Sequence, residues 1–230
     1  MLIGILETGH APDALRARAG SYPQMFERLL APHGFDFRTW SVVDMEFPDS
    51  VHDAEGWLIT GSRHGAYDDL PFIPPLEALI RQAMAEGVPL VGICFGHQII
   101  AQALGGRVEK FHGGWAVGPQ DYDFDGQTLR LNAWHQDQVI APPPGAEVIA
   151  THPFCAFAGL RIGDKALTVQ PHPEFDDAFI EGLIETRGRG VVPDDRLDAA
   201  LADLGAPNDA AAIAARIAAF FRQPRRPAAA

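Results

Sequence analysis

Cysteine and basic residues are scarce in this chain of 230 residues. It has only two cysteines, and its 18 lysines and arginines are outnumbered by 30 aspartates and glutamates, which gives a net charge of -12. Two cysteines exclude a disulfide framework, so a hydrophobic core has to hold the fold. The acidic charge repels phosphate backbones and therefore argues against nucleic acid as a partner.

Long apolar runs are also lacking. The apolar residues 1–6 end at Glu7, and they have neither the basic residues nor the small-residue cleavage site of a signal peptide. The sequence contains no run of about 20 apolar residues, the length of a transmembrane helix. We expect no membrane contact and a cytoplasmic location, where a thiol stays reduced.

The order of apolar segments in the first half predicts an α/β fold. Strands are expected at about 2–6, 35–39, 57–60 and 88–93, helices at about 23–31, 76–84 and 97–104, and a polar loop at 7–20. Alternating strands and helices are typical of a parallel, doubly wound sheet with helices on both faces.

From about residue 107 the pattern changes to short strands divided by turns. Strands are expected at about 115–124, 128–132, 146–151, 154–158 and 166–170, followed by helices at about 176–187, 194–204 and 208–222. The prediction is a three-layer, mostly parallel sheet with an antiparallel extension and C-terminal helices. We assign residues 1–188 to one domain and 189–230 to a helical extension packed on it, with fraying of the last few residues.

One turn has the features of a nucleophile site: Gly92-Ile93-Cys94-Phe95-Gly96-His97-Gln98 joins a predicted strand to a predicted helix. Such a turn exposes a nucleophile, and the flanking glycines let the backbone approach its neighbours closely. The helix start stabilises a negative charge on the Cys94 sulfur, and the Phe95 amide can donate to an oxyanion. A buried structural cysteine is the alternative. The Gly-x-Cys-x-Gly pattern also occurs in cysteine members of the α/β-hydrolase group.

A base for this thiol is expected in the segment Gln170-Pro171-His172-Pro173-Glu174-Phe175. Residues two apart in an extended segment point the same way, so Glu174 can orient the His172 ring. The two prolines stiffen the segment and keep the pair aimed. A histidine in an ordinary proline-rich loop is the alternative.

Together, the two motifs resemble those of class I, triad-type glutamine amidotransferases, over roughly residues 1–176. The resemblance implies a flavodoxin-like fold in which Cys94 attacks the side-chain amide of glutamine, His172 takes its proton and Glu174 orients His172. The chain order of cysteine, histidine and glutamate also argues against an α/β-hydrolase, in which an acid lies between the nucleophile and the histidine.

The resemblance extends to two loops that would border the substrate. Thr60-Gly61-Ser62-Arg63-His64-Gly65 is similar to the loop whose glycine amide completes the oxyanion hole with Phe95, so Gly61 takes that role. Its Gly-Ser-x-His form, followed by Tyr67, resembles small stand-alone members, including γ-glutamyl peptidases of plants. Ser62 is a candidate substrate contact, and Arg63 and His64 either contact a substrate carboxylate or are solvated.

The segment Ala133-Trp134-His135-Gln136-Asp137 resembles the family segment that borders the glutamine site. Backbone groups near Trp134 and His135 would hold the α-amino and α-carboxylate groups, and Gln98 is expected to face the same pocket. His135 and Asp137 lack the partners and spacing of a metal site, so we expect no metal and no cofactor.

The resulting hypothesis is hydrolysis of a γ-glutamyl amide, in glutamine or another γ-glutamyl compound, through a thioester on Cys94. Two alternatives stay open: a glutaminase subunit that delivers ammonia to a separate synthase, and a non-catalytic protein that binds a metabolite. A small γ-glutamyl substrate is expected in either catalytic case, and a homo-oligomer is compatible with the sequence.

Overall fold

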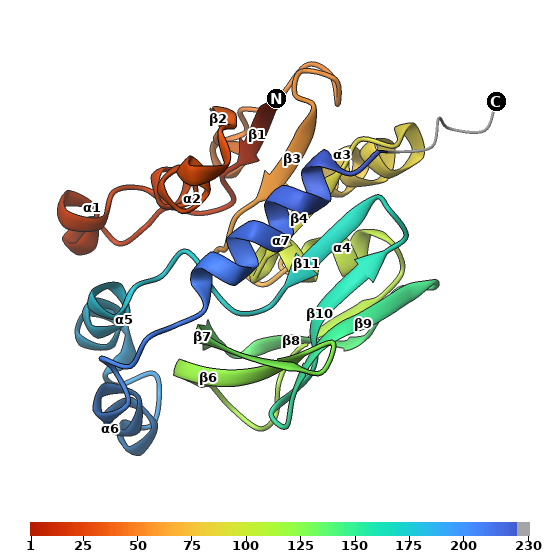
Figure 1. Cartoon of the computed structure of the whole chain (residues 1–230). Helices are drawn as coiled ribbons and strands as arrows, with labels where there is room; N and C mark the ends of the chain where they lie inside the picture. Colours follow the sequence, from red (N-terminus) through yellow and green to blue (C-terminus); the bar gives the residue numbers. More distant parts are fainter. Residues whose placement is uncertain (225–230) are drawn as a thin grey trace.

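A nine-stranded sheet runs through the middle of the molecule, in the order β2-β1-β3-β4-β11-β10-β9-β6-β7 (Figure 1). The computed structural model describes residues 1–224. Five neighbouring strands are parallel: β1 (Leu2–Leu6), β2 (Asp36–Trp40), β3 (Gly56–Ile59), β4 (Leu90–Ile93) and β11 (Ala166–Val169). The strand order reverses beside β1, so the predicted doubly wound sheet is confirmed.

Four antiparallel strands extend this sheet: β6 (Ala116–Phe124), β7 (Gln127–His135), β9 (Ala146–His152) and β10 (Cys155–Ile162). They confirm the antiparallel extension. Two strands that we did not predict, β5 (Arg107–Lys110) and β8 (Asp137–Ala141), form a separate two-stranded sheet. Only one residue of β5 is buried, so its sequence carries little apolar alternation.

Helices cover both faces of the sheet. One face packs on α2 (Tyr22–Leu30) and α7 (Ala210–Arg222), the other on α3 (Ile73–Glu86) and α4 (Phe95–Ala103). Figure 1 shows α7, in blue, crossing in front of the parallel strands. Successive strand side chains alternate between the two layers: Ile5 packs toward α2 and α7, whereas Leu6 packs toward α3 and α4.

Three further helices, α1 (Asp13–Ala19), α5 (Asp177–Leu183) and α6 (Asp194–Ala202), form a separate apolar cluster. The predicted loop at 7–20 is wrong over Asp13–Ala19. Leu15 is the only buried residue of α1 and packs against Gly182 of α5. A tertiary contact rather than an apolar stripe of its own therefore stabilises this helix, which is why its sequence did not reveal it.

The chain between these helices contains shorter turns. Helix α5 continues as a π-helical turn, Ile184–Gly188, and 3₁₀ turns occur at Ala31–His33 and Val42–Asp44. Beyond residue 188, α6 packs on β6 and α7 packs on α2. The division of the chain at residue 188 stays a prediction, and the fraying expected of the last few residues concerns 225–230, outside the described part.

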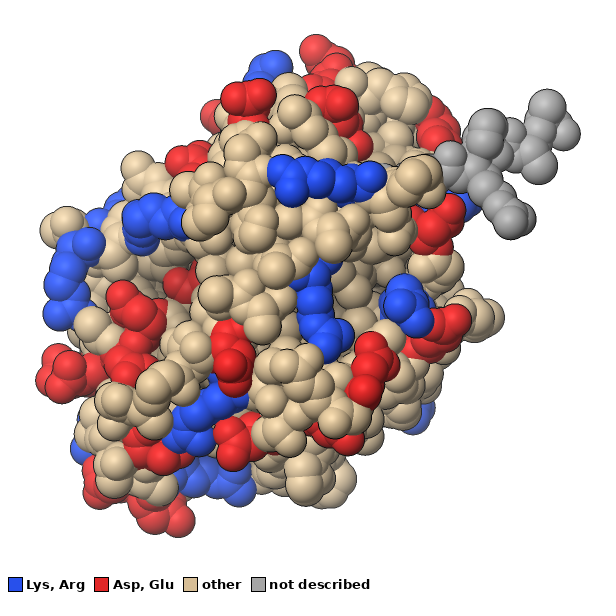
Figure 2. Space-filling model, in the orientation of Figure 1, with Lys and Arg blue, Asp and Glu red and all other residues tan. Residues whose placement is uncertain are grey.

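Charged side chains of both signs are interspersed on the face shown in Figure 2, the face that α7 crosses. Across residues 1–224, no helix combines the length and the apolar character needed to cross a bilayer.

Candidate active site

Cys94 lies on the turn between β4 and α4. Its φ of 54° and ψ of -103° lie outside the regions that ordinary residues occupy. Such a conformation costs about 1–3 kcal/mol and is typical of active sites. The Cys94 amide donates to the Val169 carbonyl of β11 at 2.9 Å, which holds the turn against the sheet. Helix α4 begins at Phe95, two residues before the predicted start, so Cys94 directly precedes it.

Two glycines make this sharp turn possible. A Cβ at Gly92 would lie 2.4 Å from the carbonyl oxygen of Gly96, and a Cβ at Gly96 would lie 2.3 Å from that of Ile59. Both contacts are far too short for any side chain. Helix α4 can therefore approach β3 and β4 this closely only with glycine at both positions.

His172 and Glu174 follow β11, and both side chains are buried. The His172 Nδ1 lies 2.7 Å from the Glu174 Oε1. The His172 amide donates to the Asn132 carbonyl of β7 at 2.8 Å, and the Asn132 side chain donates to the Phe175 carbonyl at 2.9 Å. The Phe175 ring stacks on the imidazole with ring centroids 4.0 Å apart. A carboxylate, a neighbouring strand and an aromatic ring together fix the orientation of His172.

The Cys94 side chain also acts on His172, both through its charge and as a hydrogen-bonding neighbour. Burial by itself lowers the pKa of His172, but the charges of Glu174 and Cys94 outweigh burial and raise this pKa to about 10. An imidazole with such a pKa carries a proton on both ring nitrogens at neutral pH. His172 can therefore donate one proton to Glu174 and hold the other for the sulfur or a leaving group.

Gly61 faces the same two side chains. A Cβ at Gly61 would lie 2.9 Å from the His172 Cε1 and 3.7 Å from the Cys94 Cβ, so a side chain there would crowd the imidazole. Within residues 1–224, neither the Gly61 amide nor the Phe95 amide donates a hydrogen bond. Two unpaired N–H groups beside a nucleophile are the donors that an oxyanion hole requires.

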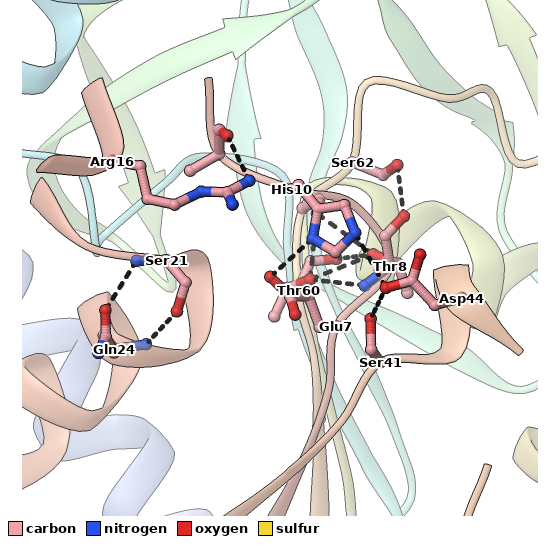
Figure 3. A network of polar contacts seen from close by, with 12 residues as sticks. Glu7, Thr8, His10, Arg16, Ser21, Gln24, Ser41, Asp44, Thr60 and Ser62 are labelled. Carbon is pink, nitrogen blue, oxygen red and sulfur yellow. Dashed lines mark hydrogen bonds and ion pairs between the residues drawn. The ribbon is translucent and has the colours of Figure 1, made fainter. Parts of the chain in front are cut away.

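A buried polar network holds the loop that carries Gly61 (Figure 3). The Thr8 hydroxyl donates to the Thr60 carbonyl at 3.0 Å and lies 3.2 Å from the Gly61 carbonyl oxygen, and the Thr8 amide donates to the Thr60 hydroxyl at 3.1 Å. The Ser62 hydroxyl donates back to the Thr8 carbonyl at 2.7 Å. These bonds tie the ends of β1 and β3 together and fix the Gly61 peptide.

A cavity of about 700 Å³ opens beside these groups. Most of the residues that the sequence assigned to the site line it, namely Gly61, Ser62, Arg63, His64, Cys94, Gln98, Trp134, His135 and His172. Two do not: Glu174 is buried behind His172, and the Phe95 ring packs on Phe72 with centroids 6.1 Å apart. The structure thus brings the predicted residues together around one space.

Some of these side chains have their donors occupied. The Ser62 hydroxyl bonds to Thr8, and the Gln98 amide donates to the Asp137 carbonyl at 2.8 Å and to the Gln170 side chain at 3.0 Å. The His64 ring packs against Phe72, and burial followed by the charge of Arg63 lowers the pKa of His64. We therefore expect these residues to contribute to the shape of the cavity wall rather than to hydrogen-bond a substrate.

His135 does offer a free polar atom. Burial, followed by the nearby charge of His172, lowers the pKa of His135 to about 3, so its ring is neutral. Its Nδ1 donates to the Asp137 carbonyl at 3.2 Å, which leaves Nε2 as an acceptor without a partner among the described residues. A buried acceptor at a cavity wall suits a cationic group such as an α-ammonium.

Tyr67 and Asp68, which follow the Gly61 loop, also line the cavity. The structure adds wall residues that the motifs did not reveal: Tyr22, Lys110, Trp115, Leu183, Thr186, Arg187, Arg189 and Val191. They come from several separate segments, and no sequence pattern links them to Cys94. Burial, followed by the influence of nearby Asp137, raises the pKa of Tyr67 to about 12. In the described part of the chain, no group of three or more His, Cys, Asp or Glu side chains is placed to hold a metal ion.

Comparison with known proteins points to one family. Residues 38–178 match the family model for class-I glutamine amidotransferases. The chain is 32% identical over 192 residues to γ-glutamyl peptidase 4 of Arabidopsis thaliana, with 76% of each chain covered. It is 30% identical over 172 residues to the glutamine-hydrolyzing GMP synthase of Thermus thermophilus, which covers 66% of this chain but 32% of that protein.

A solved structure agrees at the level of the fold. The crystal structure of a glutamine amido transferase from Methylobacillus flagellatus has a TM-score of 0.72 and 23% identity, covering 96% of this chain and 93% of that one. The matched family region includes both the Cys94 turn and the segment with His172 and Glu174. The resemblance drawn from these two motifs is therefore confirmed, and the chain belongs to the class-I glutamine amidotransferase family of enzymes.

Proposed function

We propose that this protein hydrolyses the γ-glutamyl amide bond of a small γ-glutamyl compound through a thioester on Cys94. One observation carries the proposal: a strained cysteine and a histidine with a raised pKa line one cavity, and a buried carboxylate contacts that histidine from behind. The identity with a γ-glutamyl peptidase over three-quarters of the chain supports the same bond as the target.

The reaction starts with His172 protonated beside the Cys94 thiolate. The sulfur attacks the γ-carbonyl carbon, and the amides of Gly61 and Phe95 stabilise the oxyanion. As the C–N bond breaks, His172 gives its proton to the leaving nitrogen and forms the free amine or ammonia. The neutral His172 then takes a proton from water, and the hydroxide attacks the thioester carbonyl. The C–S bond breaks, glutamate leaves, and Cys94 is released as a thiolate beside the protonated His172, which restores the starting pair.

Glu174 and His135 assist at either side of this reaction. Glu174 holds the tautomer of His172 and favours its charged form, as the third member of a triad does. The free acceptor of His135 receives a hydrogen bond from the substrate α-ammonium group, deep in the cavity. Because the nucleophile has to remain a thiol or thiolate, we expect the protein to work in a reducing compartment such as the cytoplasm.

Replacement of the nucleophile tests the proposal. Cys94→Ala should lower glutamate release from glutamine and from γ-glutamyl-p-nitroanilide by about 10⁴-fold or more, because the thioester cannot form. Cys155→Ala is the matched control, since Cys155 is a buried core thiol that is only 1% exposed and does not line the cavity. Substantial glutamate release by a folded Cys94→Ala variant would refute the proposal.

A glutaminase subunit that supplies ammonia to a synthase is the second candidate. The similarity to part of a GMP synthase favours it, because this chain matches 32% of that protein. Steady-state glutaminase activity of the purified chain separates the two candidates. A free-standing hydrolase is active alone, whereas a subunit requires the synthase for appreciable turnover.

A further inference from the structure

The cavity beside Cys94 is larger than a glutamine side chain requires. Its volume of about 700 Å³ falls in the range of about 300–1,000 Å³ typical of pockets for drug-sized ligands. At one end lie Cys94, Gln98 and His135, which are at most 5% exposed, whereas Val191 at the wall is 63% exposed. Because the γ-carbonyl has to reach Cys94, the glutamyl group occupies the buried end and the leaving amine extends toward the exposed end.

The exposed end is built by a segment outside the matched family region. The family match ends at residue 178, and Leu183, Thr186, Arg187, Arg189 and Val191 all line the cavity. Their backbone includes the π-helical turn Ile184–Gly188, a feature that occurs frequently at functional sites. The side chains of this segment therefore line the part of the cavity that receives the leaving amine.

An apolar surface lies next to this segment. The rings of Trp115 and Trp134 have centroids 6.1 Å apart, and both line the cavity. A Cβ at Gly188 would lie 3.2 Å from the Trp134 ring, so the π-helical turn packs closely on that indole. With Leu183, these indoles form a surface that suits an aromatic or aliphatic side chain.

Arg187 stands out by the absence of a partner. Within residues 1–224, Arg187 and Arg63 are the only arginines whose side chains have neither a hydrogen bond, an ion pair nor a ring contact, and both line this cavity. Neighbouring Arg189, by contrast, is paired with Asp194 and Asp198. In a protein of net charge -12, a half-buried arginine without an acidic partner is placed to receive an anion.

We propose that Arg187 is a specificity-determining residue that binds a carboxylate on the amine side of the scissile bond, next to the Trp115 and Trp134 surface. The preferred substrates are then γ-glutamyl amino acids or short peptides with an apolar side chain, rather than glutamine or γ-glutamyl amines. This inference rests on the proposed γ-glutamyl hydrolysis. Arg63 comes from the loop after β3, next to Gly61, and remains available for the α-carboxylate of the glutamyl group.

A pair of donors that differ only in the carboxylate tests the proposal. We would compare kcat/KM for γ-glutamyl-phenylalanine and for γ-glutamyl-2-phenylethylamine, with glutamine as a third donor. Wild-type enzyme should prefer the phenylalanine compound by about 10- to 100-fold, the range expected for a charge-assisted hydrogen bond. Arg187→Gln should remove this preference, and Arg187→Lys should restore part of it.

The control is Arg107→Gln, which removes one positive charge from an exposed arginine that does not line the cavity. Equal losses for all three donors in Arg187→Gln would overturn the inference, because they would place Arg187 on the glutamyl carboxylate. Equal wild-type rates for the phenylalanine and phenylethylamine compounds would also overturn it and leave the proposed function intact. Failure of the wild type to release glutamate from any donor would overturn both, and thermal unfolding confirms that each variant is folded.

Discussion

The two ends of the cavity are built differently. At the buried end, where we propose the reaction, Cys94, His172 and Gly61 are held by hydrogen bonds or close backbone packing on the ends of parallel strands. At the other end, Arg187 and Val191 lie on a π-helical turn and the loop after it, with free charge and exposed apolar surface. Bond cleavage requires that the reacting groups be held in a fixed geometry. A charged side chain that recognises a ligand can instead remain without a protein partner until the ligand binds.

The sheet explains how the buried end of the cavity, where we propose the reaction, is held in place. The neighbouring parallel strands β1, β3, β4 and β11 end at the same edge, and the residues just after each of them meet there. Thr8, Gly61, Cys94 and His172 each follow one of these strands. We therefore expect a substitution to lower the activity more, the closer the residue lies to the Cys94 sulfur and the His172 ring.

Among substitutions that leave Cys94 in place, Glu174→Gln is expected to have the largest effect on activity. Glu174 raises the pKa of His172, so its loss lets that pKa fall and His172 loses its proton at a lower pH. We expect kcat/KM at neutral pH to drop by about 10²- to 10³-fold, and the alkaline limb of the pH profile to move to lower pH. Glu181→Gln, at an exposed position outside the cavity wall, is the control. An unmoved alkaline limb would contradict the role given to Glu174.

Gly61→Ala should have the next largest effect. The added methyl group would lie 2.9 Å from the His172 ring, so either the ring or the Gly61 amide has to shift. Loss of one oxyanion donor typically lowers kcat by about 10²-fold or more, and we expect a decrease of that size. Single-turnover rates, together with the thermal unfolding midpoint, measure the chemical step apart from folding. A fully active Gly61→Ala enzyme would rule out the oxyanion role of this loop.

A smaller effect is expected from Thr8, which touches the Gly61 peptide but not the cavity. Thr8→Val keeps the shape and removes the hydroxyl, so kcat should fall by about 10-fold with little change in KM, as for a residue that positions another. Thr8→Ser restores the hydroxyl and should recover most of the activity. A change in KM alone, or equal activity of the valine and serine variants, would show that Thr8 does not position Gly61.

Local motifs explain how much of the site the sequence could predict. The turn around Cys94 needs glycine at 92 and 96 because backbone atoms approach within 2.4 Å of where a Cβ would be, and such a requirement is visible in adjacent residues. His172 and Glu174 are likewise two residues apart on one strand end. Asn132, which fixes that strand end from β7, had no such signature and was missed.

Elements stabilised from outside were harder to predict. Helix α1 has one buried residue, and strand β5 also has one, so neither shows the periodicity that reveals an amphipathic segment. Both become ordered through partners far along the chain, α5 for the helix and β8 for the strand. The role of residues 183–191 as a cavity wall could not be predicted either, because it depends on residues far along the chain that they face.

The sequence by itself determined the alternation of strands and helices that is typical of a doubly wound sheet, the sharp turn under Cys94 and the pairing of His172 with Glu174, because each depends on residues close together in the chain. Only the tertiary structure decided that Arg63 and Arg187 share one cavity and that Thr8 supports Gly61. Such meetings follow from strand order and from the packing of distant helices, which short-range patterns do not encode.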